Sequence, residues 1–324
     1  MIEAFVVGRI GVDFTPSEPR TSLAEATTFR RAVGGFAGNI GTGLARLGIA
    51  TAVVSSVGDD GHGEHVRTAL VAEGISVAGL TTRSGSRTQV AFFEAWPPDH
   101  FPVTFYRLAP APDTLLALGE VPLDELSTAR LVIVSAALLA AEPARSTTLA
   151  ILADRQAARD RRAASWTILD LDWRPTLWAD PGEYPALVER AAELSDLLIG
   201  SDAEFAAAGL GPAAIAAGPR LVVLKHGQDG VSLLAGGGRE SLPGIPVEVT
   251  CGLGAGDALT AAVAAGLLRG LDPLAAIARG NAAGAIVASR LMCSAAMPVP
   301  AEIDELLARV PGGLLASHAQ EALP

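Results

Sequence analysis

The chain has 324 residues, a length that fits one large α/β domain with a small appendage as well as it fits two domains. Its formal net charge of -11 argues against a general nucleic-acid binder, because such a protein needs a basic surface to neutralise phosphates. No run approaches the roughly 18 consecutive apolar residues of a membrane span, and the N-terminus lacks the pattern of a secretory signal. We therefore expect a cytoplasmic protein with neither a nucleic-acid nor a membrane partner.

Cysteine and lysine usage sets further limits. Cys251 and Cys293 make no disulfide framework and lack metal-ligand spacing, so we interpret them as reduced, small hydrophobic residues. Lys225 is the only lysine. Because no Gly-Lys-Ser or Gly-Lys-Thr occurs, a P-loop is excluded, and Lys225 lacks the context of a protein-kinase lysine. An anionic ligand would have to be held by local donors.

Strand and helix patterns alternate at the start of the chain. Residues 4–8 predict a buried strand, 38–47 a helix and 50–57 a second strand. Residues 62–73 form an amphipathic helix that Gly74 ends. This alternation is typical of a largely parallel sheet.

The pattern changes between residues 87 and 107. Residues 88–94 and 103–108 predict two short strands joined by Trp96-Pro97-Pro98-Asp99-His100. Since no helix separates them, we expect them to pair antiparallel. Together with residues 9–31, the segment 87–107 is expected to form a small β lid.

From residue 131 the strand and helix alternation resumes. The predicted strands are 131–135, 166–171, 197–200, 221–225, 231–234 and 247–249, and the predicted helices are near 143–162, 183–194, 255–269, 273–289 and 300–309. We find no internal repeat. The pattern predicts a single three-layer α/β/α domain over residues 1–312, followed by a weakly ordered tail at 313–324.

The strongest local motif is Gly252-Leu253-Gly254-Ala255-Gly256-Asp257 at the start of a predicted helix. Glycines let backbone N–H groups approach a phosphate, and the helix dipole favours negative charge there. Asp257, in the first turn, would be positioned to take a proton from a hydroxyl that attacks a γ-phosphate. The alternative is an aspartate that only complements the dipole. A dinucleotide fingerprint is disfavoured by the glycine spacing and the late position of the loop.

A second glycine-rich approach to a helix is Gly34-Gly35-Phe36-Ala37-Gly38-Asn39. Paired glycines admit a ligand against bare backbone, and Asn39 offers a donor and an acceptor to hydroxyls. Tight helix packing is the alternative. Asp13 follows the first strand, at the carboxyl end where open sheets bind ligands, although it can equally cap a loop.

In their order and separation, these two glycine motifs resemble the two signatures of the ribokinase-like (PfkB) carbohydrate kinases, over about residues 3 to 310. The resemblance implies a ribokinase-like sandwich that uses ATP and Mg²⁺. It implies that Asp257 is the base, that the loop Gly254, Ala255 and Gly256 is the anion hole, and that the sugar lies under the lid. The residues it implies for the sugar are Asp13, Gly34, Gly35 and Asn39.

The resemblance also implies a nucleotide side. Lys225-His226-Gly227 with Gly230 matches the segment that flanks ATP, and Asn281 lies on the helix that borders adenine, although both can be structural. Glu204 aligns with the glutamate that organises Mg²⁺ through water, while Ser201 replaces the family's asparagine. Mg²⁺ usually keeps several waters, so this replacement is survivable. Neither activation by a monovalent cation such as K⁺ nor a homodimer through the lid is decided by the sequence.

Three stretches are similar to the 5-dehydro-2-deoxygluconokinase branch of inositol catabolism: Phe105-Tyr106-Arg107, residues 169–175 and residues 288–298. The 2-dehydro-3-deoxygluconate kinases share part of this pattern. Arg107 and Arg174 would clamp the carboxylate or the phosphorylated end of an acyclic sugar acid, unless they are surface arginines. Phe36 and Gly38 depart from the branch's usual residues, and Phe36 is expected to lie against the sugar.

Two alternatives remain open. One is another kinase of the same family, acting on 2-dehydro-3-deoxygluconate, fructose or a nucleoside. The other is a non-catalytic sugar- or nucleotide-binding regulator built on the same fold. The presence of Asp257 in its glycine loop argues against a regulator, because a binding protein needs no base.

Overall fold

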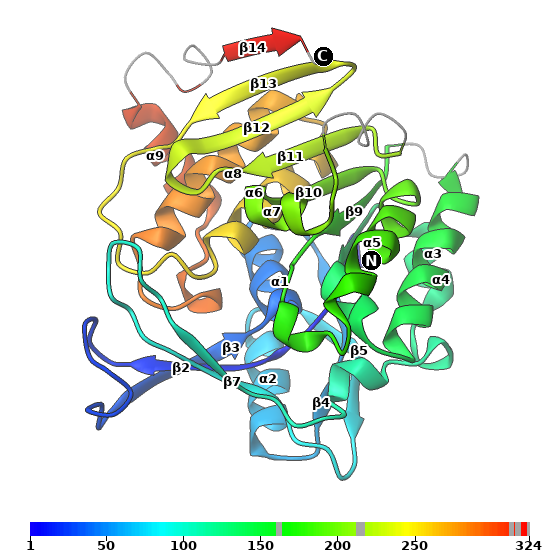
Figure 1. Ribbon diagram of the computed structural model, residues 1–324, viewed down its shortest axis with the longest axis vertical. Coiled ribbons are helices and arrows are strands. Elements are labelled where there is room, and N and C mark those ends of the chain that lie inside the picture. The colour runs from blue at the N-terminus through cyan, green and yellow to red at the C-terminus, as the bar shows by residue number, and fades with distance from the viewer. Residues whose placement is uncertain (160–163, 212–217, 311–313, 315–318, 323–324) are drawn as a thin grey trace.

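Two β-sheets organise the chain (Figure 1). The computed structural model describes residues 1–159, 164–211, 218–310, 314 and 319–322. Most of the tail predicted at 313–324 therefore lies outside the described residues, although residues 319–322 form a strand.

The larger sheet has ten strands in the order β14-β13-β12-β11-β10-β9-β8-β1-β4-β5. The strands from β5 to β11 in this order run parallel, and β12, β13 and β14 add antiparallel to that edge. Fully buried apolar runs such as Leu131–Ser135 explain the parallel part, because such strands are covered on both faces. The strands are β1 (Ala4–Val7), β4 (Thr51–Gly58), β5 (Ser76–Arg83), β8 (Leu131–Ser135), β9 (Trp166–Asp170), β10 (Leu197–Ser201), β11 (Leu221–Lys225), β12 (Gly230–Ala235), β13 (Gly238–Pro243) and β14 (Ala319–Ala322).

Helices cover both faces of this sheet, which confirms the predicted three layers (Figure 1). Ala4 and Val6 of β1 pack into one hydrophobic cluster, and Phe5 and Val7 into the other, as the alternation of side chains along a strand requires. The first cluster contains residues of α1 (Phe36–Arg46), α2 (Gly61–Ala72), α7 (Ala255–Leu268), α8 (Pro273–Ala288) and α9 (Pro300–Arg309). The second contains residues of α3 (Leu123–Thr128), α4 (Ala144–Ala157), α5 (Tyr184–Glu193) and α6 (Asp202–Ala207). None of the described helices is both long and apolar enough to cross a membrane.

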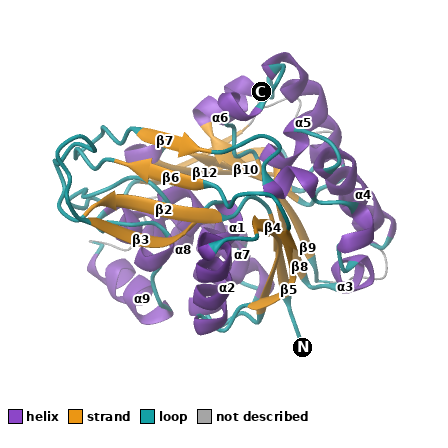
Figure 2. Ribbon diagram, turned by 90° about the horizontal axis from the view of Figure 1, so that it is seen from below, coloured by secondary structure: helices purple, strands orange, loops and turns teal. Residues whose placement is uncertain are grey.

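The smaller sheet has four strands in the order β3-β2-β6-β7 and extends from one side of the body (Figure 2). They are β2 (Gly11–Pro16), β3 (Phe29–Gly34), β6 (Val90–Phe93) and β7 (Val103–Tyr106). The predicted hairpin is confirmed, because β6 and β7 pair antiparallel, while β2 and β6 pair parallel. The sheet is built from the two segments predicted to form the lid.

The strand predicted at residues 247–249 is wrong. This stretch forms no ladder, and β13 occupies the position beside β12 instead. A short run with valines at 247 and 249 has β propensity, but it has no neighbouring strand to supply hydrogen bonds. The segment lines a cavity beside α7 and α8.

Candidate active site

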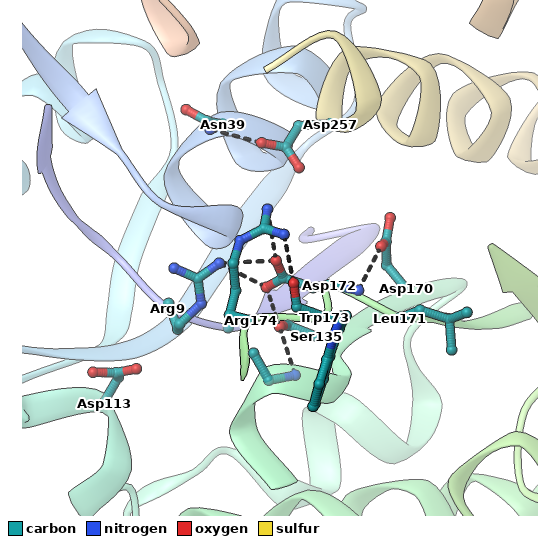
Figure 3. A network of polar contacts seen from close by, with 12 residues as sticks. Arg9, Asn39, Asp113, Ser135, Asp170, Leu171, Asp172, Trp173, Arg174 and Asp257 are labelled. Carbon is teal, nitrogen blue, oxygen red and sulfur yellow. Dashed lines mark hydrogen bonds and ion pairs between the residues drawn. The ribbon is translucent and has the colours of Figure 1, made fainter. Parts of the chain in front are cut away.

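The two glycine motifs meet at Asp257. Gly254 precedes α7 with a left-handed φ of 82°, and a Cβ there would lie 2.8 Å from the Cβ of Cys293, so the turn requires glycine. Asp257 lies in the first turn of α7. Asn39, from the first turns of α1, donates from Nδ2 to Asp257 Oδ2 at 2.7 Å (Figure 3). Residues predicted to act on the same substrate are thus brought together across 218 positions of sequence.

Burial raises the pKa of the Asp257 carboxyl to about 6. The hydrogen bond from Asn39 opposes this rise in pKa, the negative charge of Asp172 adds to it, and the positive charges of Lys225 and Arg174 oppose it. A carboxylate with this pKa is mostly ionised at neutral pH and yet accepts a proton more readily than an exposed aspartate. These properties suit a general base.

The proposed sugar side is built around Asp13 and the paired glycines. A Cβ on Gly34 would lie 2.1 Å from Asp13 Cγ, so the bare side of Gly34 accommodates that carboxyl. Gly35 has a left-handed φ of 80°, and a Cβ there would lie 2.8 Å from the carbonyl oxygen of Arg9. Burial raises the pKa of Asp13 to about 6, against a hydrogen bond from the Cys293 thiol and the charge of Arg9. Gly34 therefore accommodates Asp13, and Gly35 accommodates the Arg9 backbone, rather than only leaving room for a ligand.

Phe36 does not lie at the site surface, so the expectation that it contacts the sugar is wrong. Its side chain is 2% exposed and belongs to the hydrophobic core. A Cβ on Gly8 would lie 2.5 Å from Phe36 Cδ1, so the ring packs directly against the end of β1. Removal of the apolar ring from water is favourable. A sugar site, which is polar and hydrated, would bury the ring less completely.

A cavity of about 670 Å³ lies beside the start of α7. It is lined by four of the residues that the family resemblance placed on the nucleotide side, together with part of the glycine loop, but not by His226 or Glu204. These lining residues are Lys225, Gly227, Gly230, Asn281, Ala255 and Gly256. Pro98 and Asp99, from the loop between β6 and β7, reach the same cavity. Asn281 also has a structural role, because its Nδ2 donates to the Pro243 carbonyl at 2.8 Å.

Lys225 ends β11 beside the glycine loop. Its Nζ lies 3.3 Å from Asp170 Oδ2 and 3.8 Å from Glu204 Oε2. A Cβ on Gly256 would lie 3.6 Å from Nζ, which places the ammonium group next to the predicted anion hole. Burial alone would lower the pKa of Lys225, but Asp170, Glu204 and Asp257 outweigh it and raise that pKa. The ammonium group therefore carries its charge at this position.

Asp172 is the centre of a second polar network (Figure 3). Arg9 Nη2 donates to both of its carboxylate oxygens at 2.9 and 2.8 Å, and Ser135 Oγ donates at 2.6 Å. Arg174 Nη2 lies 3.2 Å from Asp172 Oδ1. Burial would raise the pKa of Asp172, but Arg9 and Arg174 outweigh it and lower that pKa. Asp172 is therefore an ionised, buried carboxylate.

Sequence reasoning assigned no role to Asp170, Asp172 or Arg9. The available signal was two aspartates two positions apart at the carboxyl end of a buried strand. Carboxylates in such a setting need cationic or hydrogen-bonding partners. Asp170 accordingly accepts from Thr260 Oγ1 of α7 at 2.7 Å and faces Lys225.

Glu204 closes a capping box at the start of α6. Its Oε2 accepts from the Ser201 backbone N–H at 2.7 Å, and its Oε1 accepts from that of Trp173 at 3.2 Å. Arg174 Nη1 lies 3.7 Å from Oε1. Within the described residues, no group of three or more His, Cys, Asp or Glu side chains is arranged to hold a metal ion directly.

The two arginines predicted to clamp an acid are held by different aspartates. Arg107 Nη1 and Nη2 donate to the two oxygens of Asp113 at 2.9 and 3.0 Å, and Gln89 also accepts from Nη1. Asp113 is 1% exposed, so this bidentate pair is inaccessible on the aspartate side. Arg174 instead lies between Asp172 and Asp257 (Figure 3).

The fold and the site together define a sugar kinase of the ribokinase type. The sequence model of the pfkB family carbohydrate kinases matches residues 1–300, and the chain belongs to this family. It is 31% identical over 320 residues to a 5-dehydro-2-deoxygluconokinase of Clostridium tetani, covering 94% of this chain and 93% of that protein. It is 32% identical over 311 residues to a protein of the same name from Photobacterium profundum, covering 92% of each.

A solved structure supports the fold assignment. A putative ribokinase II of E. coli, in complex with ATP and Mg²⁺, superimposes with a TM-score of 0.84 at 22% identity, covering 95% of this chain and 100% of that one. At this level of identity the likeness concerns the fold. The predicted ribokinase-like sandwich is confirmed.

Proposed function

We propose that this kinase transfers the γ-phosphoryl group of ATP to a small sugar acid, 5-dehydro-2-deoxy-D-gluconate, and forms its 6-phosphate. The observation that carries the proposal is Asp257, which accepts from Asn39 at the head of α7, directly after the bare backbone of Gly254 to Gly256. Relatives that carry this substrate in their name match over more than nine tenths of both chains. The arginine-containing stretches at residues 105–107 and 169–175 support the same branch.

In the proposed reaction, Asp257 takes the proton of the substrate hydroxyl as its oxygen attacks the γ-phosphorus. The bond from that phosphorus to the β,γ-bridging oxygen breaks, and ADP leaves with the bond's electron pair. The backbone N–H groups of Ala255 and Gly256 face the negative charge that develops on the transferred group. Asn39 keeps the carboxylate of Asp257 in place through the 2.7 Å hydrogen bond.

Mg²⁺ fits this site as an ion that arrives with the nucleotide. No group of three or more His, Cys, Asp or Glu side chains among the described residues is arranged to hold a metal, whereas Mg²⁺ commonly keeps several waters and phosphate ligands. When bound, it neutralises charge on the β- and γ-phosphates. Glu204, held by the capping box, would orient one of its waters.

The four-stranded sheet would act as a lid over the sugar. Pro98 and Asp99 of its β6–β7 loop already line the nucleotide cavity. Closure would exclude water, which otherwise competes with the sugar as phosphoryl acceptor. Arg107, fixed by Asp113 where the chain leaves β7, is our candidate for the acid end of the substrate.

Two family features belong to the proposal at a finer level. Phe105 and Tyr106, on opposite faces of the edge strand β7, are 42% and 62% exposed, which favours burial of this edge strand in a homodimer through the lid. Sedimentation of the protein and of a Tyr106→Glu variant measures the dimer. Activation by a monovalent cation is measured by assaying with K⁺ and with choline. We place the reaction in the cytoplasm.

An ADP-release screen across sugar acids, hexoses and nucleosides tests the function, with Asp257→Asn as the catalytically impaired control. We expect the highest kcat/KM with 5-dehydro-2-deoxygluconate, and ADP release from the variant that is slower by about two to four orders of magnitude. Preference for 2-dehydro-3-deoxygluconate, fructose or a nucleoside would assign another kinase of the family. No ADP release with any acceptor, together with retained nucleotide binding, would favour a regulator.

A further inference from the structure

Two buried aspartates close the carboxyl end of β9. Asp170 is the last residue of the strand and Asp172 follows two positions later, and they are 2% and 4% exposed. Removing a carboxylate from water is costly unless cations and hydrogen-bond donors compensate. Each of the two aspartates forms an ion pair with a basic side chain that also faces the proposed active site.

Asp170 holds Lys225, and Asp172 holds Arg174. The distances are 3.3 Å from Lys225 Nζ to Asp170 Oδ2 and 3.2 Å from Arg174 Nη2 to Asp172 Oδ1. Glu204 lies between the two cations, 3.8 Å from Lys225 and 3.7 Å from Arg174. The side chains of two strands and the loop after β9 thus converge on one small region.

Both cations face the residues of the proposed active site. The guanidinium of Arg174 lies between the carboxylates of Asp172 and Asp257 (Figure 3). The ammonium of Lys225 lies against Gly256, whose N–H group belongs to the anion hole. A guanidinium has five N–H donors and an ammonium three, so each cation can keep its aspartate and still donate to a phosphate oxygen.

The backbone at Asp172 is strained in a way that serves this arrangement. Its φ is 35°, in the left-handed region that non-glycine residues rarely adopt. Two hydrogen bonds from Arg9 and one from Ser135 hold the side chain in place. Strain of this kind persists where surrounding contacts over-determine it, and it concentrates at functional sites.

We propose that Arg174 and Lys225 form a cationic pair that binds the transferring phosphoryl group, and that Asp172 and Asp170 are the positioning residues that direct them to it. This inference rests on the proposed kinase function. It assigns Arg174 to the reacting end of the substrate, whereas the acid end is left to Arg107. The donors are fixed before the nucleotide arrives, so they need little reorganisation during the reaction.

The kinetic test compares Arg174→Gln and Lys225→Met with the wild type. We expect kcat to fall about 100- to 1,000-fold for each, as for loss of a donor to the transition state, with the KM for the sugar acid within about threefold. Arg174→Lys should recover part of the loss. If Arg174→Gln instead raises the KM for the acid and spares kcat, Arg174 binds the substrate carboxylate and the proposal is wrong for it.

A binding test separates this proposal from the function itself. ADP with aluminium fluoride imitates the transferring phosphoryl group, and its affinity is measured by calorimetry beside that of ADP alone. We expect each variant to keep the affinity for ADP within about threefold and to lose most of the gain from aluminium fluoride. Equal gains in wild type and variants would overturn the proposal. This arm gives an answer even if no sugar acid is phosphorylated.

Asp172→Asn and Asp170→Asn test the positioning role, and Asp196→Asn is the matched control. The Asp196 side chain is also 4% exposed and also contacts two arginines, but just before β10. We expect about tenfold lower kcat in the first two variants, as for a misplaced donor, and wild-type kcat in the control. An equal loss of kcat in all three variants would mean that the loss comes from lower protein stability, and it would refute the positioning role.

Discussion

A buried aspartate that contacts two arginines occurs at both ends of the central sheet, but it serves a different purpose at each. At the carboxyl end, Asp172 contacts Arg9 and Arg174. At the amino end, Asp196 contacts Arg159 and Arg220 and accepts from the Thr167 backbone N–H at 2.9 Å. The side chains of both aspartates are 4% exposed. A buried aspartate with two arginines is therefore no sign of an active site by itself.

The two sites differ in what surrounds their arginines. The side chains of Arg159 and Arg220 are 35% and 50% exposed, and that of Arg174 is 43% exposed, so exposure does not separate the two ends. What separates them is that Arg174 faces Asp257, the proposed base, and that Arg9, beside it on Asp172, is only 8% exposed at its side chain. In a parallel sheet, helix N-termini follow the carboxyl ends of the strands, and only at this end can the cations meet a glycine loop and a base.

Asp257→Asn should show the largest effect at the carboxyl end. We expect turnover to fall by about two to four orders of magnitude, because asparagine cannot take the hydroxyl proton. ADP release measures turnover, and calorimetry with ADP measures nucleotide binding, which should be kept. Near-normal turnover would show that Asp257 only complements the helix dipole.

The pH dependence of kcat/KM should come from Asp257, at the carboxyl end of the sheet. The base must be ionised, and burial raises the pKa of Asp257 to about 6. Thus kcat/KM should be highest above about pH 7 and fall about tenfold per pH unit below about pH 6. The charged groups facing Asp257 include Asp172, Lys225 and Arg174. A profile measured from pH 4.5 to 8.5 checks this.

Charge-removing variants should shift the acid limb of this pH profile in opposite directions. Arg174→Gln removes a positive charge that lowers the pKa of Asp257, so the acid limb should move to higher pH. Asp172→Asn removes a negative charge that raises this pKa, so the limb should move to lower pH. Asp196→Asn should leave it in place. A limb that stays fixed in all three variants would assign the titration to another group, such as Asp13.

Asp196→Asn should have the smallest effect on chemistry. We expect the free energy of unfolding to fall by about 1–3 kcal/mol, because a buried charge-assisted hydrogen bond is weakened. Turnover at 25 °C should stay within about twofold of wild type. Urea unfolding measures the stability, and ADP release measures the turnover. A large loss of turnover would mean that the two ends of the sheet are not functionally distinct.

Local patterns in the sequence were sufficient for much of this molecule. The buried strands β1, β8 and β11, the antiparallel hairpin of β6 and β7, and the start of α7 follow from apolar runs, turn residues and glycine placement. These features depend on short stretches whose conformation neighbouring residues largely determine. Lys225, Gly227, Gly230 and Asn281, which the resemblance to the PfkB kinases assigned to the nucleotide, line one cavity.

Tertiary structure decided the rest. β13, with the sequence Gly-Arg-Glu-Ser-Leu-Pro, has no apolar run and exists because β12 offers it hydrogen bonds. The pairing of Arg9 with Asp172 spans 163 positions and depends on the order of strands in the sheet. The Phe36 side chain lies in the core, because removing its ring from water is more favourable than a contact with a polar sugar. A sequence shows which side chains are available, whereas burial and strand order decide which of them meet.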